Sequence, residues 1–279
     1  MIKSPSPTVS RREGAGSYVQ SLARGLNVIG VLDTPEPLSL SEVARRAELS
    51  RAAARRFLLT LCELGYVRQL DGRFALTPRV LELGSAYLSS LTMPEIALPH
   101  IKALVELVHE SGVLSVLDGD SVVGVARVPA GRIVTGTTVL GQRLPAWASA
   151  SGRVLLAGLS GEQLDERLRR VEFEPLTANT VPTRQALVAE LDRVRAQGWA
   201  LVDQELEVGL RAVAAPIRDD RGAVLATVCL VLQSVAASLR EIELLLVPPL
   251  LAACGEIARD LAASASRIGA ASSFVSVGG

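Results

Sequence analysis

The sequence predicts an α+β protein with a small, mostly helical N-terminal part and a larger C-terminal part that mixes helices with antiparallel strands. Three observations predict it. Capped amphipathic helical patterns precede an Asp-Gly hairpin before residue 80. β-rich runs joined by short turns lie between helical patterns farther along the chain. The 279 residues, 49% of them hydrophobic, suffice for two cores.

The N-terminal part begins with an amphipathic helical pattern over residues 18–32, which the segment TPEP ends. Ser39 and Glu42 then form a Ser-x-x-Glu capping box, in which each side chain can bond to the backbone N–H of the other residue. This box predicts a short second helix that runs through Ala47.

Ser50 is placed to cap a third helix over residues 51–64, and Gly65 stands where a left-handed residue commonly ends a helix. The run YVRQL-DG-RFAL predicts two short strands around a tight turn, because Asp-Gly suits the type I′ turn of hairpins. Three helices followed by a hairpin predict a winged helix-turn-helix domain over residues 17–78, whose third helix enters a DNA major groove.

Arginines are concentrated in residues 40–77, which hold seven of them against four acidic residues, whereas the whole chain balances 29 basic against 29 acidic residues. A solvated surface is the plain alternative, because the chain uses 27 arginines and only 2 lysines throughout. The ordered caps, helices and hairpin favour double-stranded DNA as the partner. The residues predicted to contact it are Ser50, Arg51, Ala52, Arg55 and Arg56 at the third helix, Arg45 beside the second, and Arg68 and Arg73 on the hairpin.

Residues 79–94 are predicted to form a linker helix that carries contacts between copies of the chain. Residues 1–16 and 266–279 are predicted to be disordered tails. No apolar run approaches the roughly 18 residues that span a bilayer, and the N-terminus lacks the apolar core of a secretory signal. Since the three cysteines lie far apart in apolar contexts, we expect reduced thiols in a cytoplasmic protein that does not associate with membranes.

The larger part spans residues 95–265 and opens with a helical pattern, EIALPHIKALVELVHESG. The next segment, VLSVLDGDSVVGVARV, is a strand–turn–strand pattern. Further capped helices lead to three β-rich runs, and Ser238 caps a last helical region that ends near Ala263 and is kinked at Pro248-Pro249. Hairpin strands with helices at both ends predict an antiparallel sheet flanked by helices.

The larger part lacks the sequence arrangements of common catalytic and metal sites. A Gly-x-Ser-x-Gly elbow and a glycine-rich phosphate loop are absent, and the two histidines, His100 and His109, share one helical pattern. The acidic run at 203–207 is expected to face solvent. Small residues before Gly152 lead into a helix, whose free N–H groups favour a carboxylate. Trp147 either walls such a pocket or packs in the core. We therefore expect a binding protein and not an enzyme, with no cofactor and no metal.

Four segments together resemble the IclR family of bacterial transcriptional regulators, in family order from about residue 17 to 263. They are SLARGLNVIGVL, the helix-turn-helix and hairpin described above, LPAWASASGRVLLA, and WALVDQELEVGLRAVAAPIRDDRGAVLA. The forms YVQSLARGLNVI and VDQELEVGLRAVAAPI resemble the subgroup that regulates aromatic-acid catabolism through the β-ketoadipate pathway, the protocatechuate and p-hydroxybenzoate regulators. The resemblance implies a GAF-like effector-binding domain, a homodimer or homotetramer, and a small organic acid as effector.

The resemblance also implies which residues bind the effector: Leu144, Trp147, Ser149, Ala150, Ser151, Asp203, Leu210, Ala212, Cys229 and Val231. Some family members carry polar residues at the positions of Ala212, Cys229 and Val231, so the more apolar wall here suits an aromatic ring better than a two- or three-carbon acid. Arg127 and Arg143 are candidates to pair a carboxylate, or are surface charges. The alternative function is a small-molecule sensor that acts through protein partners, with the basic N-terminal part as a dimerisation module.

Overall fold

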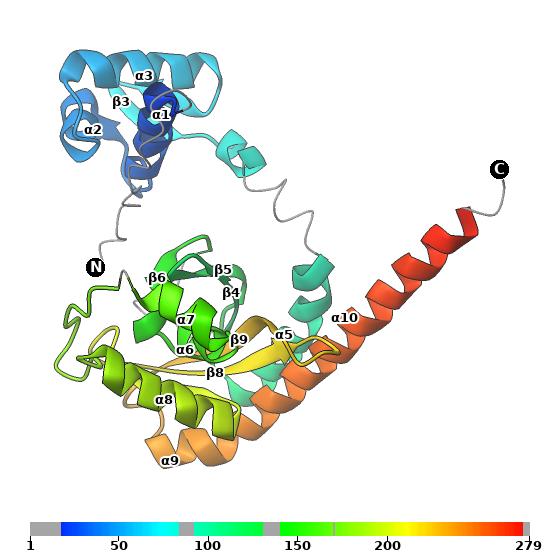
Figure 1. Cartoon of the computed structure of the whole chain (residues 1–279). Helices are drawn as coiled ribbons and strands as arrows, with labels where there is room; N and C mark the ends of the chain where they lie inside the picture. Colours follow the sequence, from blue (N-terminus) through cyan, green and yellow to red (C-terminus); the bar gives the residue numbers. More distant parts are fainter. Residues whose placement is uncertain (1–17, 84–91, 131–139, 170, 276–279) are drawn as a thin grey trace. The chain divides into compact units, whose positions relative to one another are not determined.

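The computed structural model of the chain describes residues 18–83, 92–130, 140–169 and 171–275. The chain divides into two compact units, an N-terminal unit that ends at residue 90 and a C-terminal unit that begins at residue 91 (Figure 1). The tail predicted over residues 1–16 lies outside the described residues. Each unit has a hydrophobic core of its own, which agrees with an α+β chain of two parts.

The N-terminal unit consists of three helices and a small antiparallel sheet in the order β1-β3-β2. Its elements are α1 (Gln20–Val31), β1 (Leu38–Ser39), α2 (Leu40–Arg46), α3 (Arg51–Glu63), β2 (Val67–Leu70) and β3 (Arg73–Leu76). Val28, Val43 and Leu58 from the three helices and Phe74 from the sheet are buried together in its core. Each helix therefore contributes its apolar side to one cluster.

The predicted caps of this unit are confirmed. The Ser39 hydroxyl accepts a hydrogen bond from the Glu42 N–H, the Glu42 carboxylate accepts one from the Ser39 N–H, and the Ser50 hydroxyl accepts one from Ala53 N at 3.2 Å. Gly65 after α3 has φ +80°. Asp71 and Gly72 have φ 48° and 74°, as a type I′ hairpin turn requires.

Two features of the unit differ from the sequence prediction. The third helix, predicted over residues 51–64, ends at Glu63, and Leu64 belongs to the turn that follows and is 50% exposed. The strand β1 was not predicted, since its two residues gain their strand conformation only by pairing with Phe74 and Arg73 of β3.

The linker helix predicted over 79–94 is described only in part. Residues Pro78–Val80 form a 3₁₀ turn, residues 81–83 are helical, and residues 84–91 lie outside the described residues. Helix α5 (Thr92–Val108) then begins a few residues earlier than expected, because Pro94 fits the first turn of a helix, where its missing N–H costs nothing.

The C-terminal unit is built on a six-stranded antiparallel sheet in the order β6-β5-β4-β9-β8-β7 (Figure 1). The strands are β4 (Ser111–Asp118), β5 (Ser121–Val128), β6 (Arg143–Pro145), β7 (Ala200–Asp203), β8 (Leu210–Arg218) and β9 (Val224–Gln233). The helices besides α5 are α6 (Ala150–Ala157), α7 (Gly161–Leu168), α8 (Arg184–Gln197), α9 (Leu239–Glu241) and α10 (Val247–Val275). The predicted α+β class is confirmed.

Helices cover both faces of this sheet. Side chains such as Leu230 and Val213 face α5 and α10, whereas their strand neighbours Cys229 and Ala214 face α6 and α8. This alternation is the ordinary period of two along a strand, and here both faces are apolar because both are covered. Two cores result, one on each side of the sheet.

The last helical region differs from the prediction in its end. A π-helical stretch, Ile242–Leu246, precedes the proline pair, which cannot donate N–H groups to the preceding turn. Helix α10 then continues to Val275, so the tail expected over 266–279 is helical as far as Val275. Alanine, the best helix former, is frequent in this segment, which explains the extension. Within the described residues, no helix combines the length and apolar character needed to cross a bilayer.

Candidate functional site

A cavity opens on the α6 side of the large sheet, with a volume of about 70 Å³. One buried water needs roughly 10–15 Å³ on the same measure, so the cavity has room for several waters or a small organic molecule. The structure brings eight of the ten residues predicted to bind an effector to its wall: Leu144, Ser149, Ala150, Ser151, Leu210, Ala212, Cys229 and Val231.

The floor of the cavity comes from alternate residues of the central strands. Cys229 and Val231 of β9 face it, and they pair across the sheet with Val113 of β4 and Ala212 of β8, which also line it. Val202 of β7 continues the same surface. The wall is therefore mostly apolar, with small side chains that leave the space open.

The rim of the cavity is formed by the start of α6. Ser149 caps this helix, and its hydroxyl accepts a hydrogen bond from Gly152 N at 3.1 Å. A Cβ atom on Gly152 would lie 2.0 Å from the carbonyl oxygen of Ala146, so only glycine lets the helix approach the preceding turn so closely. This contact explains the run of small residues, and it sets Ala150 and Ser151 against the cavity.

The thiol of Cys229 is neutral in this setting. Complete burial raises the pKa of Cys229 to about 12, and the nearby Ser151 side chain offsets this only in part. The cavity therefore presents an uncharged, polarizable sulfur beside the Ser151 hydroxyl.

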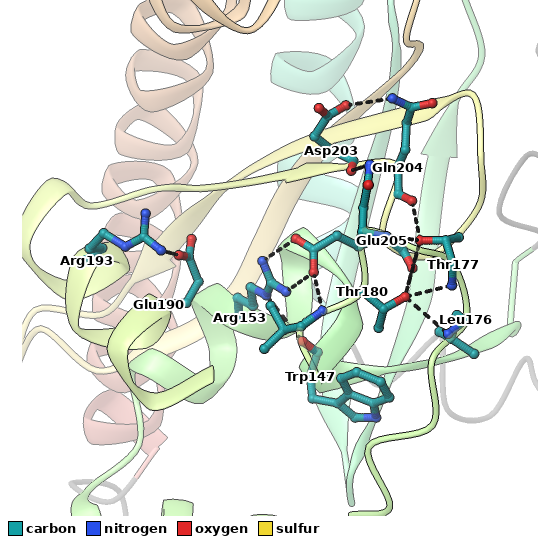
Figure 2. Close-up of polar contacts among 12 residues, drawn as sticks. Trp147, Arg153, Leu176, Thr177, Thr180, Glu190, Arg193, Asp203, Gln204 and Glu205 are labelled. Atoms are coloured by element: carbon teal, nitrogen blue, oxygen red, sulfur yellow. Dashed lines mark hydrogen bonds and ion pairs between the residues drawn. The ribbon is translucent and has the colours of Figure 1, made fainter. Parts of the chain in front are cut away.

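Trp147, predicted to bind the effector, does not line the cavity. Its ring packs on Phe173 with centroids 5.2 Å apart and a 59° tilt, and the residue is buried in the α6-side core. Its backbone carbonyl accepts a hydrogen bond from Arg153 Nε at 3.2 Å (Figure 2). The alternative weighed from the sequence, a core tryptophan, is the correct one.

Asp203 is the second predicted residue that lies elsewhere. Successive side chains of a strand point to opposite faces, and Val202 already occupies the cavity side. Asp203 therefore points to the other face, where Arg211 Nε donates a hydrogen bond to it at 2.6 Å. That hydrogen bond holds the pKa of Asp203 below its ordinary value.

The acidic run 203–207, expected to face solvent, instead contains a buried carboxylate. Arg153 Nη1 and Nη2 donate hydrogen bonds to the two oxygens of Glu205 at 2.8 and 2.5 Å, and Val181 N donates a third at 3.1 Å (Figure 2). The Arg153 and Glu205 side chains are 1% and 11% exposed. The pair connects α6 to the loop between β7 and β8.

Two threonine hydroxyls also form hydrogen bonds with the loop between β7 and β8. Thr177 and Thr180 donate to the carbonyls of Gln204 and Glu205, both at 2.7 Å (Figure 2). The loop thereby holds further cavity residues in place. The lining residues that the sequence prediction missed are Val113, Ser115, Val122, Gly124, Gln142, Val202, Leu206, Glu207 and Arg211. Those on strands other than Arg211 follow the two-residue period of the predicted ones, the signal that points to them.

The N-terminal unit presents three of the predicted arginines on α3. Arg51, Ala52, Arg55 and Arg56 are exposed along α3, while Leu58 on its opposite side is fully buried. Arg45 at the end of α2 and Arg68 on β2 are also exposed. Ser50 acts as the cap of α3.

Arg73, also predicted to contact DNA, is engaged within the unit. Its Nη1 donates to the Pro37 carbonyl at 2.9 Å and lies 3.9 Å from the Glu42 carboxylate. The reason is the unpredicted strand β1, which places the 37–39 segment beside β3. Arg73 therefore ties the hairpin to the start of α2.

Among the described residues, no group of three or more His, Cys, Asp and Glu side chains is arranged so that it could hold a metal ion. His100 contacts the carboxylates of Glu256 and Asp260, at 3.3 and 2.8 Å, and thereby joins α5 to α10.

Comparison with known proteins gives the family. Residues 21–71 match the IclR helix-turn-helix domain, and residues 85–259 match the bacterial transcriptional regulator IclR C-terminal domain. The Pca regulon regulatory protein of Pseudomonas putida is 37% identical over 264 residues, which are 94% of this chain and 90% of that protein. The p-hydroxybenzoate hydroxylase transcriptional activator of Acinetobacter baylyi is 35% identical over 75% of this chain and 79% of its own length.

A solved structure supports the same conclusion. An IclR homologue from Microbacterium hydrocarbonoxydans, crystallised in complex with 4-hydroxybenzoate, is 27% identical and superposes with a TM-score of 0.74 over 87% of this chain and 99% of its own. The family and these relatives are transcriptional regulators and not enzymes. The chain belongs to the IclR family of bacterial transcriptional regulators, with an N-terminal helix-turn-helix DNA-binding domain and a C-terminal effector-binding domain.

Proposed function

We propose that the C-terminal cavity binds a small aromatic carboxylate and that this effector changes the affinity of the regulator for its operator. The observation that carries the proposal is the cavity wall of Ala212, Cys229 and Val231, which offers apolar contact to a flat ring. The relatives named for p-hydroxybenzoate and crystallised with 4-hydroxybenzoate support the same ligand class.

The cavity also suits the charge of such a ligand. The start of α6 lies at the rim, where backbone N–H groups and the helix dipole favour an anion. The hydroxyls of Ser149 and Ser151 add hydrogen-bonding partners. A two- or three-carbon acid would leave much of the apolar wall uncovered, so an aromatic acid gains more from burial.

The exposed side of α3 is the proposed DNA-reading surface. Arg55 and Arg56 are placed to reach base edges or phosphates in a major groove, with Arg51, Ala52 and Ser50 at the end of the helix that enters it. Arg45 and Arg68 are proposed to contact the phosphate backbone.

We further propose that the regulator acts as a homodimer or a pair of homodimers. Leu22 and Leu26 lie one turn apart on α1 and are 63% and 54% exposed, an apolar surface that a second copy would cover. Two copies would place two reading helices on one operator and would multiply the phosphate contacts. An effector that binds one arrangement of the two copies better than another would shift the operator affinity.

Thermal unfolding of the full chain with candidate acids tests the effector. A ligand at about 100 times its Kd adds close to 2.7 kcal/mol by mass action. We expect protocatechuate or 4-hydroxybenzoate to raise the melting temperature of the C-terminal unit, and glyoxylate and pyruvate to leave it unchanged. A shift with the short acids alone would refute the aromatic ligand class.

Fluorescence anisotropy with the DNA that flanks the gene tests the other half of the proposal. We expect salt-sensitive binding that changes when the effector is added. DNA binding that the effector leaves unaltered would favour the alternative, a sensor that acts through protein partners.

A further inference from the structure

A β-bulge lies in the sheet beside the cavity. Along the β4–β5 ladder, Ser115 pairs with Gly124, but the next residue of β4, Leu114, pairs with Ala126, so Val125 is the extra residue. A bulge shifts the alternation of the strand by one residue. Before it Val122 and Gly124 face the cavity; after it Ala126 faces the α5 side.

The shift places Arg127 on the cavity side of the sheet. Arg127 pairs with Val113, and directly paired residues of antiparallel strands point to the same face. Val113 lines the cavity beside Cys229, and Arg127, which is not itself among the lining residues, lies next to Val113 on the same face of the sheet. With regular alternation, residue 127 would have pointed into the α5-side core instead.

Arg127 is partly buried, and its guanidinium makes no hydrogen bond or ion pair with any of the described residues. A partly buried cation without a partner is unfavourable, because burial removes some of its water without giving it a counter-charge. Such an arrangement is expected where a ligand supplies the missing anion.

The other arginines near the cavity already have carboxylate partners. Arg143 pairs with Asp118 and Arg153 pairs with Glu205. Arg211, which is itself among the lining residues, pairs with Asp203, whose side chain points to the other face of the sheet. An arginine whose donors are engaged gains less from a ligand carboxylate than one whose donors are free.

The cavity also contains a group that repels a carboxylate. Glu207 lines the cavity from the loop between β7 and β8, whereas Arg127 lies on β5. Strands β4 and β9 lie between β5 and β8 in the sheet. About 14 Å of sheet separates β5 from β8 at roughly 4.8 Å per strand. The field inside the cavity therefore favours an anion at the β5 side and a hydrogen-bond donor, such as a phenolic hydroxyl, at the Glu207 side.

We infer that Arg127, turned toward the cavity by the bulge at Val125, binds the carboxylate of the effector, so that an aromatic hydroxy acid lies with its acid group toward β5 and its hydroxyl toward Glu207. The inference rests on the proposed function and adds the residue that selects for the acid and the direction in which the ligand lies. Arg143, which the sequence left as an equal candidate, is assigned to Asp118 instead.

Isothermal titration of the full chain with 4-hydroxybenzoate and with its uncharged carboxamide tests the inference. In the wild-type protein we expect the acid to bind more tightly than the amide. The Arg127→Met variant should raise the Kd of the acid by roughly 10- to 100-fold and leave that of the amide within about twofold. Arg127→Lys should recover part of the loss, because it keeps the charge but not the planar fork.

One matched variant serves as the control. Arg143→Met removes an arginine that has its own acidic partner, and we expect the Kd of the acid to change by less than about twofold. Glu207→Gln tests the other end of the ligand: it should weaken binding of 4-hydroxybenzoate, whose hydroxyl loses a charged acceptor, and leave that of benzoate, which has no hydroxyl, within about twofold.

The outcomes separate the inference from the proposed function. If the wild-type chain binds no aromatic acid, the proposed effector class and this inference both fail. If it binds the acid and Arg127→Met binds it equally well, the inference alone fails. Should Arg127→Met not fold, judged by circular dichroism, the wild-type comparison decides: equal affinity for acid and amide would overturn the role of a cation.

Discussion

The guanidinium of Arg153 and the carboxylate of Glu205 form a two-pronged ion pair inside the C-terminal unit, with Nη1–Oε1 at 2.8 Å and Nη2–Oε2 at 2.5 Å. Arg153 Nε also donates a hydrogen bond to the Trp147 carbonyl, and Glu205 Oε2 accepts one from the Val181 N–H. Ion pairs in the interior are favourable only when further hydrogen bonds support them, and each partner here makes one beyond the pair itself. The pair fixes the β7–β8 loop, and with it one wall of the cavity, to α6.

Replacing one member of this pair should destabilise the unit strongly. We expect Glu205→Gln or Arg153→Met to lower the free energy of unfolding by about 3–5 kcal/mol, because the remaining charge or polar group stays buried without its partner. Urea unfolding followed by tryptophan fluorescence measures it, since both tryptophans, Trp147 and Trp199, lie in this unit. Disrupting the exposed Arg184–Asp165 pair with Asp165→Asn should cost less than about 1 kcal/mol. Similar losses at both pairs would contradict the structural role.

The ion pair between Asp203 and Arg211 should make stability depend on pH. The hydrogen bond from Arg211 keeps the pKa of Asp203 below its ordinary value of 3.8 in the folded protein. The ionised form is therefore stabilising above that value, and the contribution is lost as the pH falls through the lower folded pKa. Asp203→Asn should be less stable than the wild type at pH 7, with a difference that shrinks below about pH 4. Urea midpoints at pH 7, 5, 4 and 3 measure this, and a constant difference would refute it.

Adding a single methyl group at Gly152 should displace α6. Its Cβ would lie 2.0 Å from the Ala146 carbonyl oxygen, a backbone atom that cannot rotate away. We expect Gly152→Ala to lower the unfolding free energy by about 1–3 kcal/mol or more and to weaken effector binding, since Ser149 and Ser151 would move with the helix. Gly161→Ala in α7 is the control, because nothing lies within 4 Å of its Cβ position, and it should be neutral. Equal effects of the two changes would mean that the close approach is unimportant.

Local signals in the sequence predicted most of the elements. The caps at Ser39 and Ser50 and the Asp71-Gly72 turn each depend on residues within a few positions of one another, so a short window contains the whole interaction. The cavity wall was predicted from the resemblance to the family, which implied Leu210, Ala212, Cys229 and Val231 on what are now β8 and β9.

The predictions that failed depend on contacts between distant segments. Glu205 was expected in solvent, and only its contact with Arg153, 52 residues away, makes its burial favourable. The hydrogen bond from Arg73 to the Pro37 carbonyl was not foreseen, because it depends on a strand of two residues, while the predicted DNA contact of Arg73 stays a prediction. The bulge that turns Arg127 appears only in the pairing of β4 with β5. No local pattern contains these relationships.

The last prediction concerns the reading helix. Arg55→Ala should weaken operator binding by about 1–3 kcal/mol if the side chain reads a guanine, and it should relax the preference at one base pair only. Anisotropy titrations on an operator and its single-base variants, each at several salt concentrations, distinguish this from a phosphate contact, which would lower affinity uniformly and reduce the salt slope by about one.

Two other arginines serve for comparison with Arg55. Arg240→Ala removes an exposed arginine from the C-terminal unit and should change neither the affinity nor the salt slope. Arg73→Ala should mainly lower the stability of the N-terminal unit, because its guanidinium bonds to Pro37. Unaltered affinity and salt slope for Arg55→Ala would remove this side of α3 from the DNA interface.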